Sequence, residues 1–360
     1  MSWQHCKNIL CIRPDNMGDL IMSGPAIRAL KETFNAKITV LTSSAAAGIV
    51  INLPEIDEVI VSDLPWVKNQ SDDTNIAFFN IIEDIKKREF DGAVIFTVYS
   101  QNPLPTVMLA YLAGIPNRLA YCRENPYRLL SDWLPDKEPY SFIKHQVQRD
   151  LDLVAIVGAF TKNDHLNLNS DRNIWSTVRH KLETLGVDTA KSWIILHAGV
   201  SEVKREYPSK NWIEIGKQII NELGYQVIYT GSEAEKQLTG YLQGNTGKGS
   251  FSAGGIFNLD EFIVLIAKAP FIISVNTGTV HIAAALQIPV VVLYAMTNPQ
   301  HTPWKSPNKV LPFSVPESMQ SKNEIVRYVN ERLIIEPIKL PSVEDILNAL
   351  QELVGNSISV

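Results

Sequence analysis

The sequence predicts an α/β protein that is built from two parallel β-sheets covered by helices. Short apolar runs typical of strands alternate with longer segments of helical period in both halves of the chain, which is the pattern of parallel sheets. The length of 360 residues corresponds better to two domains than to one. A polar stretch without apolar period lies between the halves. We therefore expect two domains joined by a short linker.

The first half is expected to alternate strand and helix from its beginning. Strands are expected at 8–12, 37–41, 58–61 and 93–97, and helices at 24–34, 44–52 and 75–88. Pro25 is placed at the start of its helix, where a missing N–H costs nothing.

The second half repeats this scheme. Strands are expected at 193–197, 226–229, 271–274 and 289–294, and helices at 212–223, 233–241, 259–267 and 278–286. The stretch 297–322 is rich in Pro and Ser and is expected to be irregular. A closing helix is expected from Ser342, which has the spacing of a capping box with Asp345. The two halves are thus expected to be Rossmann-like.

The polar stretch 161–172 is expected to be the linker. The predicted domains are therefore 1–160 and 173–340. Residues 341–360 would form the closing helix and a tail.

Composition and charge exclude several classes of protein. Hydrophobic residues make up 45% and charged residues 20%, as in a soluble chain with a sizeable core. The 33 Lys and Arg against 38 Asp and Glu give a net charge of −5, so no basic excess indicates binding to nucleic acid.

Cysteine usage and hydropathy bear on the compartment. Cys6, Cys11 and Cys122 form neither a metal-like pair nor an even disulfide framework, which predicts a reducing compartment. We find no signal-peptide core and no unbroken apolar run long enough to span a membrane, so a cytoplasmic location is expected. Asp150 and Asp152 resemble a metal-binding DxD, but we interpret them as solvated surface and expect no metal.

The loop after the first strand contains a candidate base. Asn16, Gly18 and Asp19 follow the strand, and ligands of doubly wound sheets gather at the carboxyl ends of the strands. Gly18 would allow a tight turn, and Asp19 could accept a proton from an attacking hydroxyl. The alternative, about equally favoured by this loop alone, is that an aspartate only caps the next helix.

The second domain begins with a similar loop. Lys204 lies beyond the end of the strand at 193–197 and could meet a diphosphate, although most lysines are simply solvated. The glycine and lysine spacing of a P-loop is absent. Glu233 follows the next strand, where an acidic residue often holds a ribose. Alternatively, the Glu233 carboxylate binds nothing and is only stabilised by the dipole of the helix that it begins.

The turn at 274–281 is the most specific of these elements. A buried strand ends there, and an Ala-rich helix begins with its free N–H groups directed at the strand ends, which predicts an anion site. Thr277 and Thr279 add hydroxyl donors. Alternatively, Asn276 or Thr277 is an N-cap and His281 is a packed side chain.

These motifs together resemble the ADP-heptose lipopolysaccharide heptosyltransferases, glycosyltransferase family nine. The resemblance rests on 12–19, 25–30, 275–286 and 299–304 and spans nearly the whole chain. It implies the GT-B fold, two Rossmann-like domains facing a cleft, with inversion at the anomeric carbon and no obligatory metal. A nucleotide-diphosphate sugar would be the co-substrate, bound by 173–340, while 1–160 would bind the acceptor, and no cofactor is implied.

The resemblance also implies roles for individual residues. Asp19 matches the general base, Lys204 the lysine at the donor diphosphate, and Glu233 an acidic residue at the donor ribose. The phosphate and sugar turn is matched by Asn276, Thr277, Gly278 and His281.

The sequence also departs from the family pattern. Asn276 replaces the usual Asp, Gly199 and Val200 replace hydroxyl residues of the donor loop, and Tyr207-Pro208 replaces Trp-Pro. The resemblance therefore implies the reaction class but leaves open whether heptose is the sugar.

The acceptor is expected to be a lipopolysaccharide core or another cell-surface glycan, bound by the first domain near Asn16 and Gly18. Arg118 and Arg123 could meet an anionic acceptor, or they could belong to an ordinary solvated face. At most peripheral contact with the inner membrane surface is expected. A nucleotide-sugar epimerase and a non-catalytic sugar-nucleotide-binding protein are the alternative functions.

Overall fold

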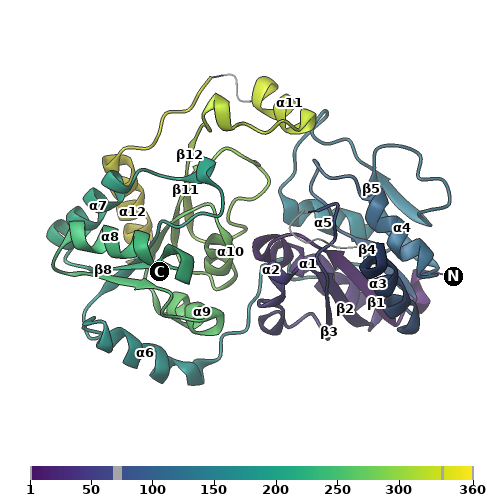
Figure 1. Cartoon of the computed structure of the whole chain (residues 1–360), viewed down its shortest axis with the longest axis horizontal. Coiled ribbons are helices and arrows are strands. Elements are labelled where there is room, and N and C mark those ends of the chain that lie inside the picture. The colour runs from purple at the N-terminus through teal and green to yellow at the C-terminus, as the bar shows by residue number, and fades with distance from the viewer. Residues whose placement is uncertain (1, 68–74, 334–335, 359–360) are drawn as a thin grey trace. The chain divides into compact units, whose positions relative to one another are not determined.

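The computed structural model describes residues 2–67, 75–333 and 336–358. Within them the chain forms two compact units, Met1–Asn167 with Asn323–Val329, and Leu168–Lys322 with Asn330–Val360. Each unit contains a six-stranded sheet in which all neighbouring strands are parallel (Figure 1). The predicted α/β class is confirmed.

The first sheet has the order β3-β2-β1-β4-β5-β6. Its strands are β1 (Asn8–Arg13), β2 (Lys37–Thr42), β3 (Glu58–Val61), β4 (Gly92–Ile95), β5 (Asn117–Cys122) and β6 (Asp132–Pro135). The helices of this part of the chain are α1 (Met17–Phe34), α2 (Ser44–Ala47), α3 (Asn75–Lys87), α4 (Leu104–Leu112) and α5 (Gln146–Ala155).

The second sheet has the order β12-β11-β10-β7-β8-β9. Its strands are β7 (Trp193–His197), β8 (Gln226–Gly231), β9 (Ser250–Gly254), β10 (Ile272–Val275), β11 (Val290–Ala295) and β12 (Asn308–Phe313). The helices are α6 (Trp175–Thr184), α7 (Ser209–Gln218), α8 (Lys236–Thr246), α9 (Leu259–Lys268), α10 (Gly278–Ala285), α11 (Glu324–Arg332) and α12 (Val343–Ile358).

Both sheets have the same topology when their strands are numbered from the first strand of each. In each sheet the first strand lies between the second and the fourth, so the chain reverses its direction of winding between β1 and β4 and between β7 and β10. Ligands of doubly wound sheets bind at the carboxyl ends of the strands beside such a switch point. The loops after β1, β7 and β10 are therefore the places for functional side chains.

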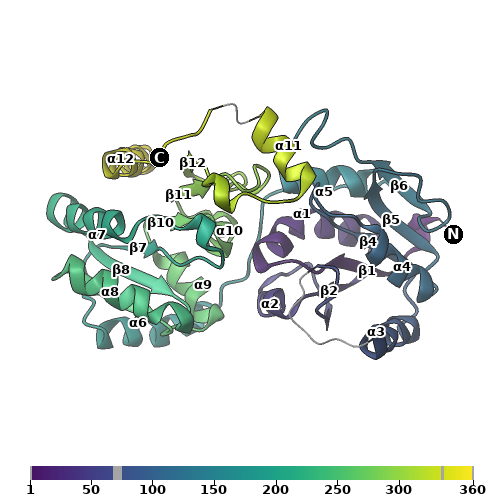
Figure 2. The ribbon, with the colours of Figure 1, turned by 45° about the horizontal axis from the view of Figure 1, so that its top comes forward.

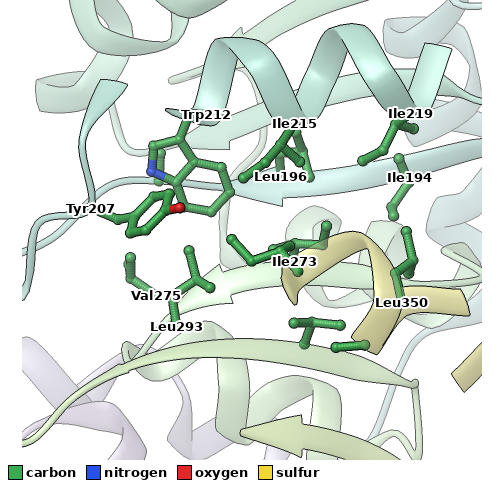
Figure 3. Packing of buried hydrophobic residues seen from close by; sticks show 14 of the residues in the cluster. Ile194, Leu196, Tyr207, Trp212, Ile215, Ile219, Ile273, Val275, Leu293 and Leu350 are labelled. Carbon is green, nitrogen blue, oxygen red and sulfur yellow. The ribbon is translucent and has the colours of Figure 1, made fainter. Parts of the chain in front are cut away.

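The core of the second unit explains the closing helix. Trp212 and Ile215 of α7 pack over Leu196 and Ile273 of the sheet, and Leu350 of α12 completes the same cluster (Figure 3). Helices α7 and α12 lie on one face of this sheet, and α6 and α9 lie on the other (Figure 2). The capping box that was predicted for the closing helix is present at the start of α12. Asp345 Oδ2 accepts from Ser342 N at 2.8 Å, and Asp345 N donates to Ser342 Oγ at 3.1 Å.

Three expectations about the elements are wrong. Helix α1 begins at Met17 rather than at residue 24, so that Pro25 lies inside the helix, because Asn16 and Asp19 form a capping box seven residues earlier. The stretch 297–322 is not wholly irregular, because β12 pairs with β11 there. The short helices and turns at 44–52 replace the single helix that was expected.

The course of the chain between the units also differs from the predicted ranges. The first passage falls between Asn167 and Leu168, inside the predicted linker, but Asn323–Val329 clusters with the first unit although it lies within the predicted second domain. Tyr328 contributes to this clustering, since its ring lies 4.9 Å from that of Tyr140. Among the described residues, no helix combines the length and the apolar character that crossing a bilayer requires.

Candidate functional site

The first turn of α1 holds the candidate base of the first unit. Asn16 N donates to Asp19 Oδ2 at 3.2 Å, and Arg13 Nη2 donates to Asp19 Oδ1 at 3.2 Å. Asp19 therefore does cap the helix, as the alternative interpretation held, and it also forms a buried ion pair. Gly18 lies in the same helical turn and not in the tight loop that was expected.

Arg13 is the cation of this region and is fully buried. Its Nε lies 3.1 Å from Asp15 Oδ2 in addition to the contact with Asp19. Burial alone would lower the pKa of Arg13, but Asp15, Asp19 and Asp150 raise it. One guanidinium is thus surrounded by several carboxyl groups.

The interpretation of Asp150 as solvated surface is wrong. It lies on α5, is 1% exposed and is hydrogen-bonded by Ser23 and Gln146. Asp152, the other acid of the DxD, is partly exposed and pairs with Lys144. Within the described part of the chain, no cluster of three or more His, Cys, Asp or Glu could hold a metal ion.

The two arginines that were expected at the acceptor are engaged in holding loops. Arg118 donates from Nε, Nη1 and Nη2 to carbonyl oxygens of the segment 115–129. Arg123 donates to the carbonyl oxygen of Glu138 at 3.0 Å and pairs with Asp136 at 3.4 Å. These contacts give both guanidinium groups structural roles in the first unit, so we assign neither of them to an acceptor.

The loop after β7 brings two cations together. Residues 203–205 form a single 3₁₀ turn, and Lys204 Nζ lies 2.6 Å from Glu202 Oε2. Arg205 Nη2 donates to Glu202 Oε1 at 2.8 Å, and its buried Nε has no hydrogen-bond partner among the described residues. Glu202 therefore balances both Lys204 and Arg205. Sequence reasoning selected Lys204 and missed Arg205.

Asn276 fixes the turn after β10. Its Oδ1 accepts from Ala295 N at 3.2 Å, and its Nδ2 donates to Ala295 O at 3.3 Å. The carbonyl oxygen of Asn276 accepts from Arg205 Nη1 at 3.3 Å. These contacts join the carboxyl ends of β7, β10 and β11. The loop that carries Lys204 and Arg205 therefore lies at the start of α10.

The N-terminus of α10 presents unused hydrogen-bonding groups. Thr277 occupies the N-cap position, but its side chain does not cap the helix, and its buried Oγ1 has no partner among the described residues. Thr277 is thus the N-cap residue by position, as the alternative interpretation held, but its hydroxyl does not act as a cap. Gly278 and the buried Thr279 and His281 follow in the first turn. Free N–H groups of this kind attract an anion.

Of the two glutamates that follow β8, Glu235 and not Glu233 lies against the loop after β7. Glu233 is exposed and pairs with Lys236 at 3.1 Å. The carboxylate of Glu235 accepts from Ser232 N at 2.6 Å and lies so close to Gly199 that a Cβ there would overlap it. Gly199 is thus required by a close approach, a signal that spacing along the sequence does not contain.

A buried histidine lies at the base of the same loop. His197 Nδ1 is 3.0 Å from Thr230 Oγ1, and His197, the last residue of β7, pairs with Thr230 of β8. Burial lowers the pKa of His197, while Glu235 acts in the opposite direction. The imidazole is therefore neutral near pH 7. Val200 packs at the edge of the core and offers no polar group.

The comparison with known families identifies the family of the chain. The sequence profile described as glycosyltransferase family 9 (heptosyltransferase) matches residues 79–328, which is more than half of the chain. The chain belongs to glycosyltransferase family 9. This family member is accordingly a glycosyltransferase.

Relatives of this glycosyltransferase align over most of its length. The lipopolysaccharide heptosyltransferase 2 of Escherichia coli K12 is 25% identical over 309 residues, covering 82% of this chain and 84% of the relative. The solved structure of E. coli ADP-heptose LPS heptosyltransferase II has a TM-score of 0.71 at 21% identity and covers 97% of this chain and 99% of its own. The structure of an E. coli heptosyltransferase with ADP-2-deoxy-2-fluoro heptose has a TM-score of 0.63 at 15% identity and covers 91% and 99%. These likenesses show that the fold is GT-B.

Proposed function

We propose that this glycosyltransferase moves a heptose from ADP-heptose to a hydroxyl of a lipopolysaccharide core, with inversion at the anomeric carbon. The observation that carries the proposal is the junction of Lys204, Arg205 and the uncapped N-terminus of α10. The curated relatives support the choice of sugar and acceptor, since they are lipopolysaccharide heptosyltransferases.

The second unit would bind the donor. Its diphosphate would lie at the N–H groups of Gly278 and Thr279, with the Thr277 hydroxyl as a further donor. Lys204 and Arg205 would supply positive charge. They would break their ion pairs with Glu202 and form ion pairs with the phosphates instead. These groups are fixed before the reaction, so they would stabilise the charge that develops on the leaving ADP.

The acidic side of this site suits a ribose. Glu235 lies beside Gly199 and Gly231, at the ends of β7 and β8, and its carboxylate can accept hydrogen bonds from hydroxyl groups. We assign it the role that the sequence suggested for Glu233. His281, buried in the first turn of α10, would border the phosphate end of the donor.

The first unit would bind the acceptor at Asn16 and Gly18 and activate it. Asp19 would take the proton of the acceptor hydroxyl as the hydroxyl oxygen bonds to the anomeric carbon of the heptose. The bond between that carbon and the phosphate oxygen would break, and its electron pair would leave with ADP. Attack from the face opposite the leaving group inverts the configuration.

Incubation with two substrates tests the proposal. ADP-heptose and a delipidated lipopolysaccharide core that lacks outer heptose should together yield free ADP and a core that is one heptose heavier, detected by mass spectrometry. ADP-heptose alone should remain unchanged. Conversion of the donor without acceptor would indicate an epimerase, and ADP binding without any turnover would indicate a non-catalytic binding protein.

A further inference from the structure

We propose that Asp150 is a positioning residue for the proposed base, because its ionised carboxylate balances Arg13 and so preserves the basicity of Asp19. This inference rests on the proposed role of Asp19. Asp150 is fully buried on α5 in the first unit, and the function described so far gives it no role.

The hydrogen bonds of Asp150 tie it to the helix that carries Asp19. Ser23 Oγ donates to Asp150 Oδ2 at 2.7 Å, and Gln146 Nε2 donates to Oδ1 at 2.7 Å. Ser23 lies one helical turn after Asp19, and its Oγ is also 3.2 Å from the Asp19 carbonyl oxygen. A single hydroxyl therefore stands between the two acidic residues.

Arg13 is the charge that both carboxylates share. Its Nη2 donates to Asp19 Oδ1, its Nε lies beside Asp15, and Asp150 stabilises its positive charge. Charges interact strongly at such a buried site because little water screens them. Removing the negative charge of Asp150 would leave more of the field of Arg13 acting on Asp19, and Asp19 would become a weaker base.

The other ionisable groups around Asp150 are committed elsewhere. Arg149 on the same helix makes two parallel hydrogen bonds of 2.9 Å to Asp136 and a third of 2.9 Å to Glu138. Tyr121 of β5 donates to the carbonyl oxygen of Arg149, and burial raises its pKa. Arg13 is therefore the principal cation that acts on Asp150.

Asp150 has two states in the range of pH where enzymes are assayed. Burial raises the pKa of Asp150 to about 6, against the opposing effect of Arg13 and of the hydrogen bonds from Ser23 and Gln146. Above that pH, Ser23 donates to the carboxylate. Below it, the protonated Asp150 can donate to Ser23 Oγ, which leaves the serine proton for the Asp19 carbonyl oxygen.

Direct titration of the carboxyl groups tests the coupling without requiring any substrate. The full-length chain is labelled at aspartate Cγ with ¹³C, and the signals of Asp19 and Asp150 are assigned from Asp19→Asn and Asp150→Asn. In Asp150→Asn the Asp19 signal should titrate at lower pH than in the parent. Asp152→Asn is the matched control, because Asp152 lies on the same helix but is partly exposed and pairs with Lys144. It should leave the Asp19 signal unmoved.

A second variant guards against a folding defect. Ser23→Ala keeps both carboxyl groups but removes a donor to the ionised Asp150, so the Asp150 signal should move to higher pH. An Asp19 signal that titrates identically in the parent and in a folded Asp150→Asn would overturn the proposal, and so would an Asp150 signal that is unmoved by Ser23→Ala.

The pH profile of sugar transfer separates this inference from the proposed function. The parent should lose activity as pH falls through about 6, where Asp150 takes up its proton. The activity of Asp150→Asn should not show this fall near pH 6. The variant should transfer sugar severalfold more slowly than the parent at pH 8 and at the same rate as the parent at pH 5. If the Asp19 signal shifts but no heptose is transferred, the coupling stands and the proposed function fails. If the activity of Asp150→Asn still fell near pH 6, the coupling between Asp150 and Asp19 would be contradicted.

Discussion

Arg13 Nη2 and Asp19 Oδ1 lie 3.2 Å apart, in an ion pair whose side chains are 0% and 11% exposed. The capping hydrogen bond from Asn16 holds the other oxygen of the same carboxylate. Asp19 is therefore fixed in orientation by two independent contacts, while a small part of it stays accessible. A base that is held in place and only slightly exposed suits transfer of one proton from a bound hydroxyl.

Asp19→Asn should abolish most of the transfer activity. The amide keeps the shape of the side chain but cannot take a proton, and general bases contribute typically about 10²–10⁴-fold to rates. The rate of ADP release in the presence of acceptor should fall by that factor. ADP affinity, measured by calorimetry, should be unchanged, since the proposed donor site lies in the second unit. A normal turnover rate would remove Asp19 from the mechanism.

Substitutions at Lys204 and Glu202 should change ADP affinity in opposite directions. Lys204→Ala removes a charge-assisted contact to phosphate, which is worth about 1.5–3 kcal/mol, so ADP should bind roughly 10- to 100-fold more weakly. Glu202→Gln removes the carboxylate that competes for Lys204 and Arg205, so ADP should bind more tightly. Lys191→Ala is the control, since Lys191 is exposed and pairs only locally with Asp188. Equal affinities in all of these variants would exclude a phosphate site here.

Gly199→Ala should weaken ADP binding without preventing folding. The new methyl group would displace the Glu235 carboxylate from its hydrogen bonds with Ser232, and a hydrogen bond of this kind contributes about 1 kcal/mol. Calorimetric affinity should fall roughly fivefold to tenfold. Gly240→Ala is the matched control, because a Cβ at Gly240 has open space around it. Should both variants bind ADP like the parent, Glu235 would have no part in the donor site.

Asn276→Asp should destabilise the second unit. An aspartate can accept from Ala295 N, but it cannot donate to Ala295 O, so two oxygens would face each other in a buried place. We expect a loss of about 1–3 kcal/mol in the free energy of unfolding, measured by denaturant titration near pH 7. The loss should shrink at pH 4, where the carboxyl group can be protonated. An unaltered stability at both pH values would show that the amide is not needed as a clamp.

The stability of the first unit should fall as pH rises from 4 to 6 because of Asp150. Its pKa is raised from 3.8 to about 6, so over this range the folded state still binds a proton that the unfolded state has released. The stability contribution is present below pH 4 and is lost by pH 7, and it amounts to about 3 kcal/mol. The melting temperature of the parent, relative to that of Asp150→Asn, should fall as pH rises from 4 to 7. A difference that is constant with pH would contradict the assignment.

Much of the fold could be predicted because apolar runs identify buried parallel strands whatever their neighbours are. The strands Glu58–Val61 and Trp193–His197 have the predicted bounds. Strands β6, β9 and β12 were not predicted, because they are edge strands that are partly exposed and their alternation is interrupted by polar residues. Strand β5 lies inside its sheet and is mostly buried, but Asn117 and Arg118 at its start interrupt the apolar run.

The site could be predicted only as far as local motifs extend. Lys204 and the turn at Asn276 each follow a strand, and the order of strands in a doubly wound sheet then brings them to one edge. Arg205, Glu235 and Asp150 were missed because their importance arises from contacts with Asn276, Gly199 and Ser23, which are far away in sequence. Pro25 was misleading because a strong cap upstream outweighs one proline in setting where a helix begins.

The return of Asn323–Val329 to the first unit constrains how members of this family could exchange halves. A hybrid spliced once, between Asn167 and Leu168, would receive a foreign 323–329 segment and lose the edge-to-face contact of Tyr328 with Tyr140 unless the other gene encoded a compatible ring. Two further junctions, at 322/323 and 329/330, are needed to keep each unit intact.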